Sequence, residues 1–336
     1  MLSNCKEWGF GDVFMQVHPY GDSFCFSSYF PWSEFVTGSY GSSSAYDPLL
    51  IASGLCEKMD LRLHAWINPL RLVETEKMLS AYPSGPIARW FKRGGGQVAE
   101  YGGRCYLVPA FGEVRALVCL AAREICEKYK VAGVHIDDYF YPTDSPDFDA
   151  AAYERFGAGK DLSQFRTDSV SDLVRELFTT VKSVNRELLF GVSPAGNPDY
   201  ARKNTFADVD RWCGEPGFAD YIVPQIYFGF EHGVCPFDRT ADLWLEMKTN
   251  PRLEIYAGLT LTKAGIPDDK YALSGSAEWS EHDDILLRSL EYARRAGYGG
   301  VCVFSYSYIA DPLSGEMRSS SAAEAKNLLS GLKEIP

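Results

Sequence analysis

The stretch GVHIDDYFYP, residues 133–142, alternates apolar and polar side chains before it ends in aromatic residues and a proline. Val134 and Ile136 are apolar, whereas His135 and Asp137 are polar. A period of two predicts a strand with one apolar face and one polar face. Such a strand fits a barrel, in which one face packs against outer helices and the other points to the barrel axis.

Further segments of the chain extend this pattern into a repeated alternation of strands and helices. Six more predicted strands, rich in β-branched or aromatic residues, are 12–19, 61–69, 188–196, 221–229, 253–261 and 300–309. Apolar residues at helical spacing predict helices over 113–130, 168–187 and 281–296. Strand–helix alternation predicts a parallel sheet with helices outside it. We therefore expect an α/β fold of the (β/α)-barrel type, with seven recognised strands in a single domain over 1–336.

An open doubly wound sheet is the competing arrangement. It usually carries a glycine-rich phosphate loop after its first strand, and the sequence has none there. In the strand over 61–69, His64, Trp66 and Asn68 alternate with apolar residues, and His18 ends the strand over 12–19 in the same way. The axial positions thus become polar toward the strand ends, where barrel enzymes keep their active sites.

Local signals mark several helix boundaries. Asp47 before Pro48 predicts an N-cap and a first helical position. Ser280 followed by Asp283 predicts a capping box for the helix over 281–296. Gly297 predicts the end of that helix.

The composition argues against several classes of protein. The net charge is −12 and no Lys/Arg run is present, which disfavours nucleic acid and anionic membrane as partners. The nine cysteines are irregularly spaced without a CxxC pair, as expected of a reduced chain. No apolar run is long enough to span a membrane, and the first eleven residues do not resemble a signal peptide.

Eight short motifs follow one another at or near the predicted strand ends. They are QVHPYGD (16–22), PWSEFVTGSYG (31–41), YDPL (46–49), HAWINP (64–69), GVHIDDYFYP (133–142), SPAG (193–196), PQIY (224–227) and GLTLTK (258–263). With these motifs the chain resembles the glycosyl hydrolase-like 10 family, also known as domain of unknown function 187, from about Gly9 to about Ile309. The resemblance implies a (β/α)8 TIM barrel related to carbohydrate-cleaving barrels. The family's first strand has no counterpart here, so we expect a barrel with its first strand missing.

The same resemblance implies a biological setting and a substrate. Members are associated with bacterial cell envelopes, so an envelope or secreted location is implied although no signal peptide is present. The implied substrate is peptide-free peptidoglycan glycan in the bacterial cell wall. The expected partner is thus a polysaccharide or oligosaccharide.

Asp137 and Asp138 are adjacent carboxylates at the end of a central predicted strand. Glycoside cleavage needs a proton donor for the leaving oxygen and a group that stabilises the oxocarbenium-like carbon. Two like charges close together resist joint ionisation, so one pKa rises and an acid survives near neutral pH. Barrel hexosaminidases have a similar acidic pair. By that resemblance Asp137 orients the substrate's 2-acetamido N–H, Asp138 is the general acid/base, and Tyr227 binds the acetamido carbonyl.

Two alternatives for this pair stay open. In an ordinary two-carboxylate mechanism the second acid comes from another strand end, with Glu231 as the main candidate and Asp22 and Glu278 as weaker ones. Alternatively, Asp137 and Asp138 are a structural pair that caps loops or holds an arginine.

Other side chains at or just past the strand ends are expected substrate contacts. Those suited to hydrogen bonding are His18, Asn68, Arg71, Ser193, Gln225 and Lys263, and those suited to stacking on sugar faces are Trp66, Tyr139, Tyr141 and Tyr227. Loop capping is the alternative for the polar set, and core packing is the alternative for the aromatic set.

A metal site is the remaining chemical alternative. His18, His64, His135 and Asp137 all fall on predicted axial positions, but no closely spaced histidine pair is present. A hydrogen-bonded polar core layer is favoured, so we predict no metal and no cofactor. Together with the Asp pair, the family resemblance implies a retaining or substrate-assisted glycosidase acting on an amino-sugar polysaccharide. The alternatives are a non-catalytic carbohydrate-binding barrel and a metal-dependent hydrolase or deacetylase.

Overall fold

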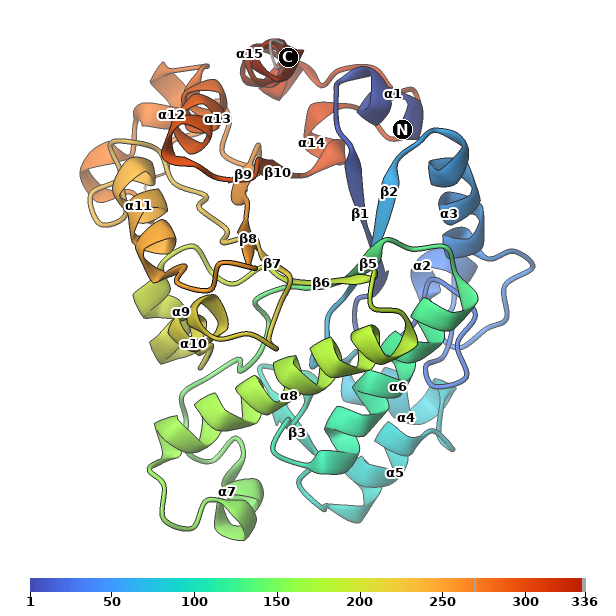
Figure 1. Cartoon of the computed structure of the whole chain (residues 1–336). Coiled ribbons are helices and arrows are strands. Elements are labelled where there is room, and N and C mark those ends of the chain that lie inside the picture. The colour runs from blue at the N-terminus through green and yellow to red at the C-terminus, as the bar shows by residue number, and fades with distance from the viewer. Residues whose placement is uncertain (269, 334–336) are drawn as a thin grey trace.

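Parallel strands form the centre of the computed structural model, which describes residues 1–268 and 270–333. One sheet has six strands in the order β1 (Asp12–His18), β2 (Arg62–Ile67), β5 (Gly133–Ile136), β6 (Leu189–Val192), β7 (Tyr221–Ile222) and β8 (Glu254–Ile255). A second sheet pairs β9 (Ala257–Thr260) with β10 (Val301–Phe304). Single bridges from Gln225 to Ala195 and Gly258 join the two sheets. Figure 1 shows the strands curving around a common centre with helices outside.

All the predicted strand segments contain parallel strands, which confirms the α/β fold with a mostly parallel sheet. The strands are shorter than predicted, because the polar residues past each strand end belong to loops. The segment 253–261 contains both β8 and β9. The antiparallel hairpin of β3 (Val98–Tyr101) and β4 (Arg104–Leu107) was not predicted from the sequence.

Helices cover the outside of the strands. They are α1 (Leu2–Glu7), α2 (Glu34–Thr37), α3 (Pro48–Lys58), α4 (Thr75–Ala81), α5 (Pro86–Arg93), α6 (Gly112–Lys128), α7 (Ala150–Phe156), α8 (Leu162–Val184), α9 (Pro198–Asn204), α10 (Val209–Gly214), α11 (Phe237–Met247), α12 (Glu278–Glu281), α13 (Ile285–Ala296), α14 (Tyr306–Ile309) and α15 (Ala322–Lys333). Within the described residues, no helix is both long enough and apolar enough to cross a membrane.

Two of the three predicted helix boundaries are confirmed. Asp47 caps α3 and accepts a hydrogen bond from the Leu50 amide at 2.9 Å. Gly297 ends α13 in the left-handed conformation, with φ of 97°. The capping box at Ser280 is wrong, because its hydroxyl bonds to the carbonyl of Ala277 within α12 at 2.7 Å, and α13 begins only at Ile285.

The strands do not close into a complete ring. β1 and β10 are the two ends of the strand order and are not paired with one another. Every residue of β5 is buried, whereas the residues of β10 and most of those of β1 are partly exposed. Figure 1 shows the gap between β1 and β10, which we call the seam.

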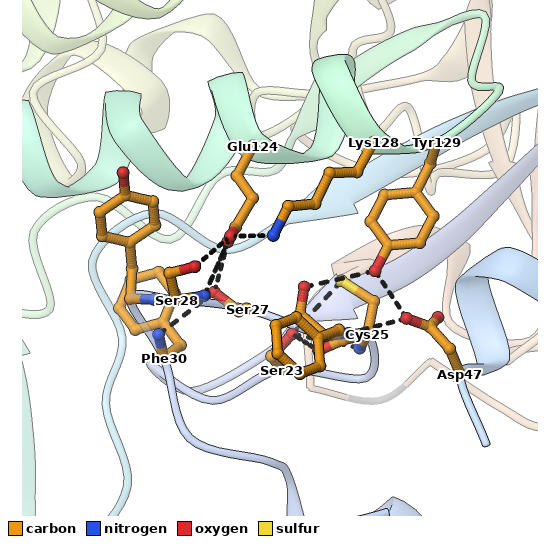
Figure 2. Close-up of polar contacts among 11 residues, drawn as sticks. Ser23, Cys25, Ser27, Ser28, Phe30, Asp47, Glu124, Lys128 and Tyr129 are labelled. Carbon is orange, nitrogen blue, oxygen red and sulfur yellow. Dashed lines mark hydrogen bonds and ion pairs between the residues drawn. The ribbon is translucent and has the colours of Figure 1, made fainter. Parts of the chain in front are cut away.

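The long loop after β1 is fixed to the end of α6 (Figure 2). The Glu124 carboxylate accepts hydrogen bonds from the Ser27 hydroxyl at 2.9 Å and the Ser28 hydroxyl at 2.7 Å, and it pairs with Lys128 at 2.6 Å. These bonds, together with burial of Glu124, hold the loop that leads from the end of β1 to α3. The loop carries Tyr20 to the rim of the site described below.

Candidate active site

A cavity of about 750 Å³ extends from the carboxyl ends of the strands into the barrel and along the seam. Its lining includes seven of the predicted site residues: Trp66, Asp137, Asp138, Tyr139, Ser193, Gln225 and Tyr227. They come from β2 and from the segments that follow β5, β6 and β7. Polar residues alternate with apolar ones along each strand, and residues paired between neighbouring parallel strands point to the same face of the sheet. The polar side chains of different strands therefore meet on one face. Trp66 pairs with His135, and both line the cavity.

Asp137 lines this cavity and is 4% exposed. Its Oδ2 accepts a hydrogen bond from the Trp66 indole N–H at 2.9 Å. Its Oδ1 is buried and has no hydrogen-bond partner among the described residues. Burial, reinforced by the neighbouring charge of Asp138, raises the pKa of Asp137 to about 7. The site therefore holds an acid near neutral pH and an oxygen that needs a donor.

Asp138 is less buried than Asp137 and also lines the cavity. Burial raises the pKa of Asp138, and a hydrogen bond from the Gln225 side chain opposes that shift. The Gln225 amide also donates to the carbonyl oxygen of Ser193 at 3.0 Å, and the Ser193 hydroxyl donates to the carbonyl of Val223 at 2.8 Å. The Gln225 side chain is thus held in place beside the Asp pair.

Aromatic rings form one wall of the cavity. The rings of Tyr227 and Phe304 stack with centroids 6.4 Å apart and an interplanar angle of 25°. Trp66 meets Phe304 edge to face, also at 6.4 Å. Phe304, which was not predicted as a site residue, ends β10, lines the cavity and is 37% exposed. Such a wall suits the apolar face of a sugar ring.

Arg71 and Lys263 lie outside the cavity lining but contact residues that form it. The Arg71 guanidinium carbon lies 4.0 Å from the ring centroid of Tyr139. The Lys263 ammonium donates to the carbonyl of Tyr227 at 2.8 Å and pairs with Asp268 at 2.5 Å. Lys263 thereby fixes the Tyr227 backbone rather than facing the cavity.

His18 is placed away from the cavity by an irregularity in β1. Gln16 pairs with Trp66, and the next pair is His18 with Ile67, so one residue of β1 is skipped. This bulge turns His18 to the helix-facing side that it shares with Ile67. There His18 is 3% exposed and packs edge to face on Phe30 at 5.0 Å, and burial lowers its pKa to about 4.

Asn68 and Tyr141 also lie outside the cavity lining. The Asn68 side-chain oxygen accepts a hydrogen bond from the Arg71 amide at 3.1 Å, which caps the turn after β2. Tyr141 is 4% exposed and packs against Phe148 and Phe206 at 5.7 and 5.3 Å. Asn68 therefore caps a loop and Tyr141 packs in the core.

The candidate second acids do not face the Asp pair across the cavity. Glu231 is exposed and outside the lining, and its amide donates to the Glu278 carboxylate at 2.9 Å. Glu278 is 1% exposed and accepts a second amide, that of Phe230, at 2.9 Å. Asp22 is 1% exposed and accepts the Tyr20 amide at 2.8 Å. Glu278 and Asp22 thus hold loop backbone.

The axial histidines form a hydrogen-bonded layer deeper in the barrel. The Tyr221 hydroxyl lies 2.9 Å from the His64 Nδ1 and 3.3 Å from the His135 Nδ1. The other His64 ring nitrogen contacts Asp12 at 3.0 Å. Among residues 1–268 and 270–333, no group of three His, Cys, Asp or Glu side chains is arranged to hold a metal ion. His64 and His135 are instead arranged as the polar core layer that the sequence analysis favoured.

The fold resembles that of glycoside hydrolase barrels of known structure. The glycoside hydrolase domain of PgaB (BpsB) from Bordetella bronchiseptica aligns with 98% of this chain and 91% of its own, at 13% identity and a TM-score of 0.66. A chitinase from Chromobacterium violaceum aligns with 98% of this chain and 94% of its own, at 11% identity and a TM-score of 0.52. At these identities the likeness is one of fold.

The chain belongs to the glycosyl hydrolase-like 10 family, whose model matches residues 1–274. It is 32% identical over 282 residues to the glycosyl hydrolase YngK of Bacillus subtilis (strain 168), covering 77% of this chain and 54% of YngK. It is 32% identical over 289 residues to the glycosyl hydrolase DigH of Escherichia coli (strain K12), covering 79% of this chain and 65% of DigH. The chain thus spans about half to two thirds of the length of these relatives.

Proposed function

We propose that this protein is a glycosidase that cleaves an amino-sugar polysaccharide at the Asp137–Asp138 pair. The observation that carries the proposal is the buried carboxyl of Asp137, which lines the cavity beside Asp138 and whose Oδ1 has no hydrogen-bond partner among the described residues. An N–H group from a bound ligand would satisfy this oxygen, and the 2-acetamido group of an amino sugar supplies one. The neighbouring Asp138 is then in reach of the same sugar.

The pair has the electrostatic properties that this chemistry requires. With a pKa of about 7, Asp137 exchanges its proton near neutral pH, and the pKa of the neighbouring Asp138 is raised as well. A ligand N–H bonded to Asp137 favours its charged form and lowers its pKa. In our proposal substrate binding keeps Asp137 ionised, and Asp138 serves as the acid.

The proposed reaction has two steps. The substrate's acetamido oxygen attacks the anomeric carbon while the glycosidic C–O bond breaks, and the leaving oxygen takes the proton of Asp138. Water then attacks the same carbon, returns a proton to Asp138 and reopens the ring formed with the acetamido group. In this proposal Asp137 holds the acetamido N–H throughout, and Tyr227, which also lines the cavity, binds the acetamido carbonyl.

The positions of the other carboxylates favour the substrate-assisted route over a two-carboxylate mechanism. Among the described residues, the cavity lining contains one acidic residue besides the pair, Asp12. Asp12 is bonded to Arg62 at 2.6 Å and to His64 at 3.0 Å, at the opposite end of the strands. A two-carboxylate mechanism needs a second acid about 5–10 Å away across the scissile bond. The substrate's own acetamido group takes that place in our proposal.

The substrate proposed is the glycan of peptidoglycan after removal of its peptides. The support is the family membership together with a cavity that combines an acidic pair and an aromatic wall. YngK and DigH are named glycosyl hydrolases, and the structural relatives include a chitinase.

Product analysis by mass spectrometry tests the proposal. The purified protein is incubated with peptide-free peptidoglycan glycan and with chitooligosaccharides, beside Asp138→Asn, Glu231→Gln and Asp144→Asn. Asp144 is an exposed acid on the loop after the pair and serves as a matched control. We expect cleavage by the native chain, at least about a hundredfold loss in Asp138→Asn, and activity within about twofold in the other two variants.

Three other outcomes would contradict parts of the proposal. Loss of activity in Glu231→Gln at native stability would restore the two-carboxylate mechanism. Binding of the glycan without any cleavage would make the protein a carbohydrate-binding barrel. A thiazoline that mimics the cyclised acetamido intermediate should inhibit the native enzyme, and lack of inhibition would argue against the substrate-assisted step.

A further inference from the structure

Arg71 has an unusual environment for a cation in a chain with a net charge of −12. Its guanidinium carbon lies 4.0 Å from the ring centroid of Tyr139 and 5.0 Å from that of Tyr20. Tyr139 follows Asp138 directly and lines the cavity, so Arg71 sits at the rim beside the acidic pair. In the described part of the chain, no carboxylate lies within ion-pair distance of Arg71.

The backbone around Arg71 is held on both sides. Its amide donates to the Asn68 side chain, and Arg71 forms a bridge with Tyr106 of β4. The Leu107 amide donates to the carbonyl of Leu70 at 2.8 Å, which ties the same segment to the hairpin. The β3–β4 hairpin, which the sequence analysis missed, therefore fixes the position of this cation.

Arg104 provides an internal comparison. Its guanidinium carbon also lies over Tyr20, at 5.3 Å, but it pairs with Glu74 at 3.6 Å. Arg71 and Arg104 thus share an aromatic neighbour and differ in whether a protein carboxylate lies within ion-pair distance, since Asp137 and Asp138 act on Arg71 from beyond that distance. A guanidinium stacked on a ring retains edge N–H groups for a planar acceptor, and carboxylates match its fork geometry.

Building on the proposed function, we propose that Arg71 binds a carboxylate carried by a sugar of the glycan and so selects carboxylated amino-sugar chains over neutral ones. In peptide-free peptidoglycan this group is the lactyl carboxylate on every second sugar. Arg71 is then a specificity-determining residue, while cleavage itself remains with the Asp pair.

The test compares two forms of one polymer. Peptide-free peptidoglycan glycan is used as it is and after its lactyl carboxyls have been reduced to alcohols. The kcat/KM for each is measured at fixed pH and ionic strength with the native enzyme, Arg71→Gln, Arg71→Lys and the control Arg104→Gln. Arg71 also affects the pKa values of Asp137 and Asp138, and a change in those values alters the cleavage of both glycans. The quantity compared is therefore the ratio of kcat/KM for the carboxylated glycan to kcat/KM for the reduced glycan.

We expect the native enzyme and Arg104→Gln to prefer the carboxylated glycan by about tenfold or more. Arg71→Gln should remove that preference, and Arg71→Lys should keep part of it. A preference that survives in Arg71→Gln, or is absent from the native enzyme, would overturn the role of Arg71 while leaving the glycosidase proposal intact.

A binding measurement separates the two proposals if no glycan is cut. Calorimetric titration of Asp138→Asn with both glycans requires no turnover. Tighter binding of the carboxylated form, lost when Arg71→Gln is added, would support Arg71 although the glycosidase proposal had failed. Equal affinities for the two forms would overturn the inference about Arg71.

Discussion

At the scale of single residues, Asp137 combines deep burial with an unpartnered oxygen, a combination that costs folding free energy. Because the pKa of Asp137 is raised, ionising its carboxyl in the folded protein lowers the free energy of unfolding. This loss is absent below the unfolded pKa of about 4 and grows as the pH rises to about 7. Such a cost is typical of a site arranged for a ligand rather than for stability.

The first prediction follows from the upward direction of the Asp137 pKa shift. Asp137→Asn removes the ionisation penalty, so it should raise the free energy of unfolding at pH 8 by on the order of 2 kcal/mol relative to the native protein. The gain should shrink toward zero near pH 4. Urea denaturation at several pH values measures it, with Asp144→Asn as control. A gain that does not vary with pH would contradict the burial effect at Asp137.

The second prediction concerns the Trp66 indole N–H, which favours the charged form of Asp137. Trp66→Phe should raise the pKa of Asp137, so the acidic limb of the pH–rate profile should move to higher pH. Activity at pH 6 should fall by about tenfold. The profile of kcat/KM between pH 4 and 8 measures the shift, and an unmoved acidic limb would show that this bond does not act through Asp137.

At the scale of elements, loops that follow the strands carry the site, and buried carboxylates hold several of them. Glu124 holds the loop after β1 to α6 (Figure 2), and Glu278 holds the loop after β7 to α12. Gly229 lies against Glu278, where an added Cβ would meet the carboxylate at 1.9 Å. The space available to each loop is therefore narrowly defined.

The third prediction tests the role of Glu278. Glu278→Ala leaves the half-buried amides of Phe230 and Glu231 without their acceptor, so it should lower the free energy of unfolding by about 1–3 kcal/mol. Glu281→Ala, at an exposed position of the same helix, should change it by less than about 0.5 kcal/mol. Chemical denaturation of both variants measures the difference, and equal effects would show that Glu278 does not hold the loop.

At the scale of the whole molecule, the seam between β1 and β10 is the principal departure from a closed barrel (Figure 1). The cavity follows the seam, where apolar residues of α13 and α15 such as Leu290 and Leu332 join its lining. One edge of each of these two strands carries backbone groups without a strand partner.

The fourth prediction follows from these unpaired edges. Amide protons of β1 and β10 that face the seam should exchange with solvent at least about tenfold faster than those of β5 and β6, which are paired on both sides. Hydrogen exchange with peptide or amide resolution measures this. Equal protection across all four strands would mean that the seam is closed in solution.

Local pattern by itself determined the strand segments, the parallel arrangement and the position of the Asp pair. Apolar and polar residues alternate in 61–69 and 133–142, and this period alone decides which side chains face the helices and which face the axis. In the structure Trp66, Asp137 and their neighbours line one cavity. The motifs at the strand ends also identified the family, which the family model confirms.

Only the tertiary structure decided which residues at the strand ends reach that cavity. A bulge in β1 turned His18 outward, because one skipped residue reverses the face of those that follow. Glu231 lies outside the lining because Glu278, distant in sequence, holds its amide. Phe304 and the fixed position of Arg71 depend on packing between segments remote in the chain. Sequence periodicity describes one element at a time, whereas these positions follow from contacts between elements.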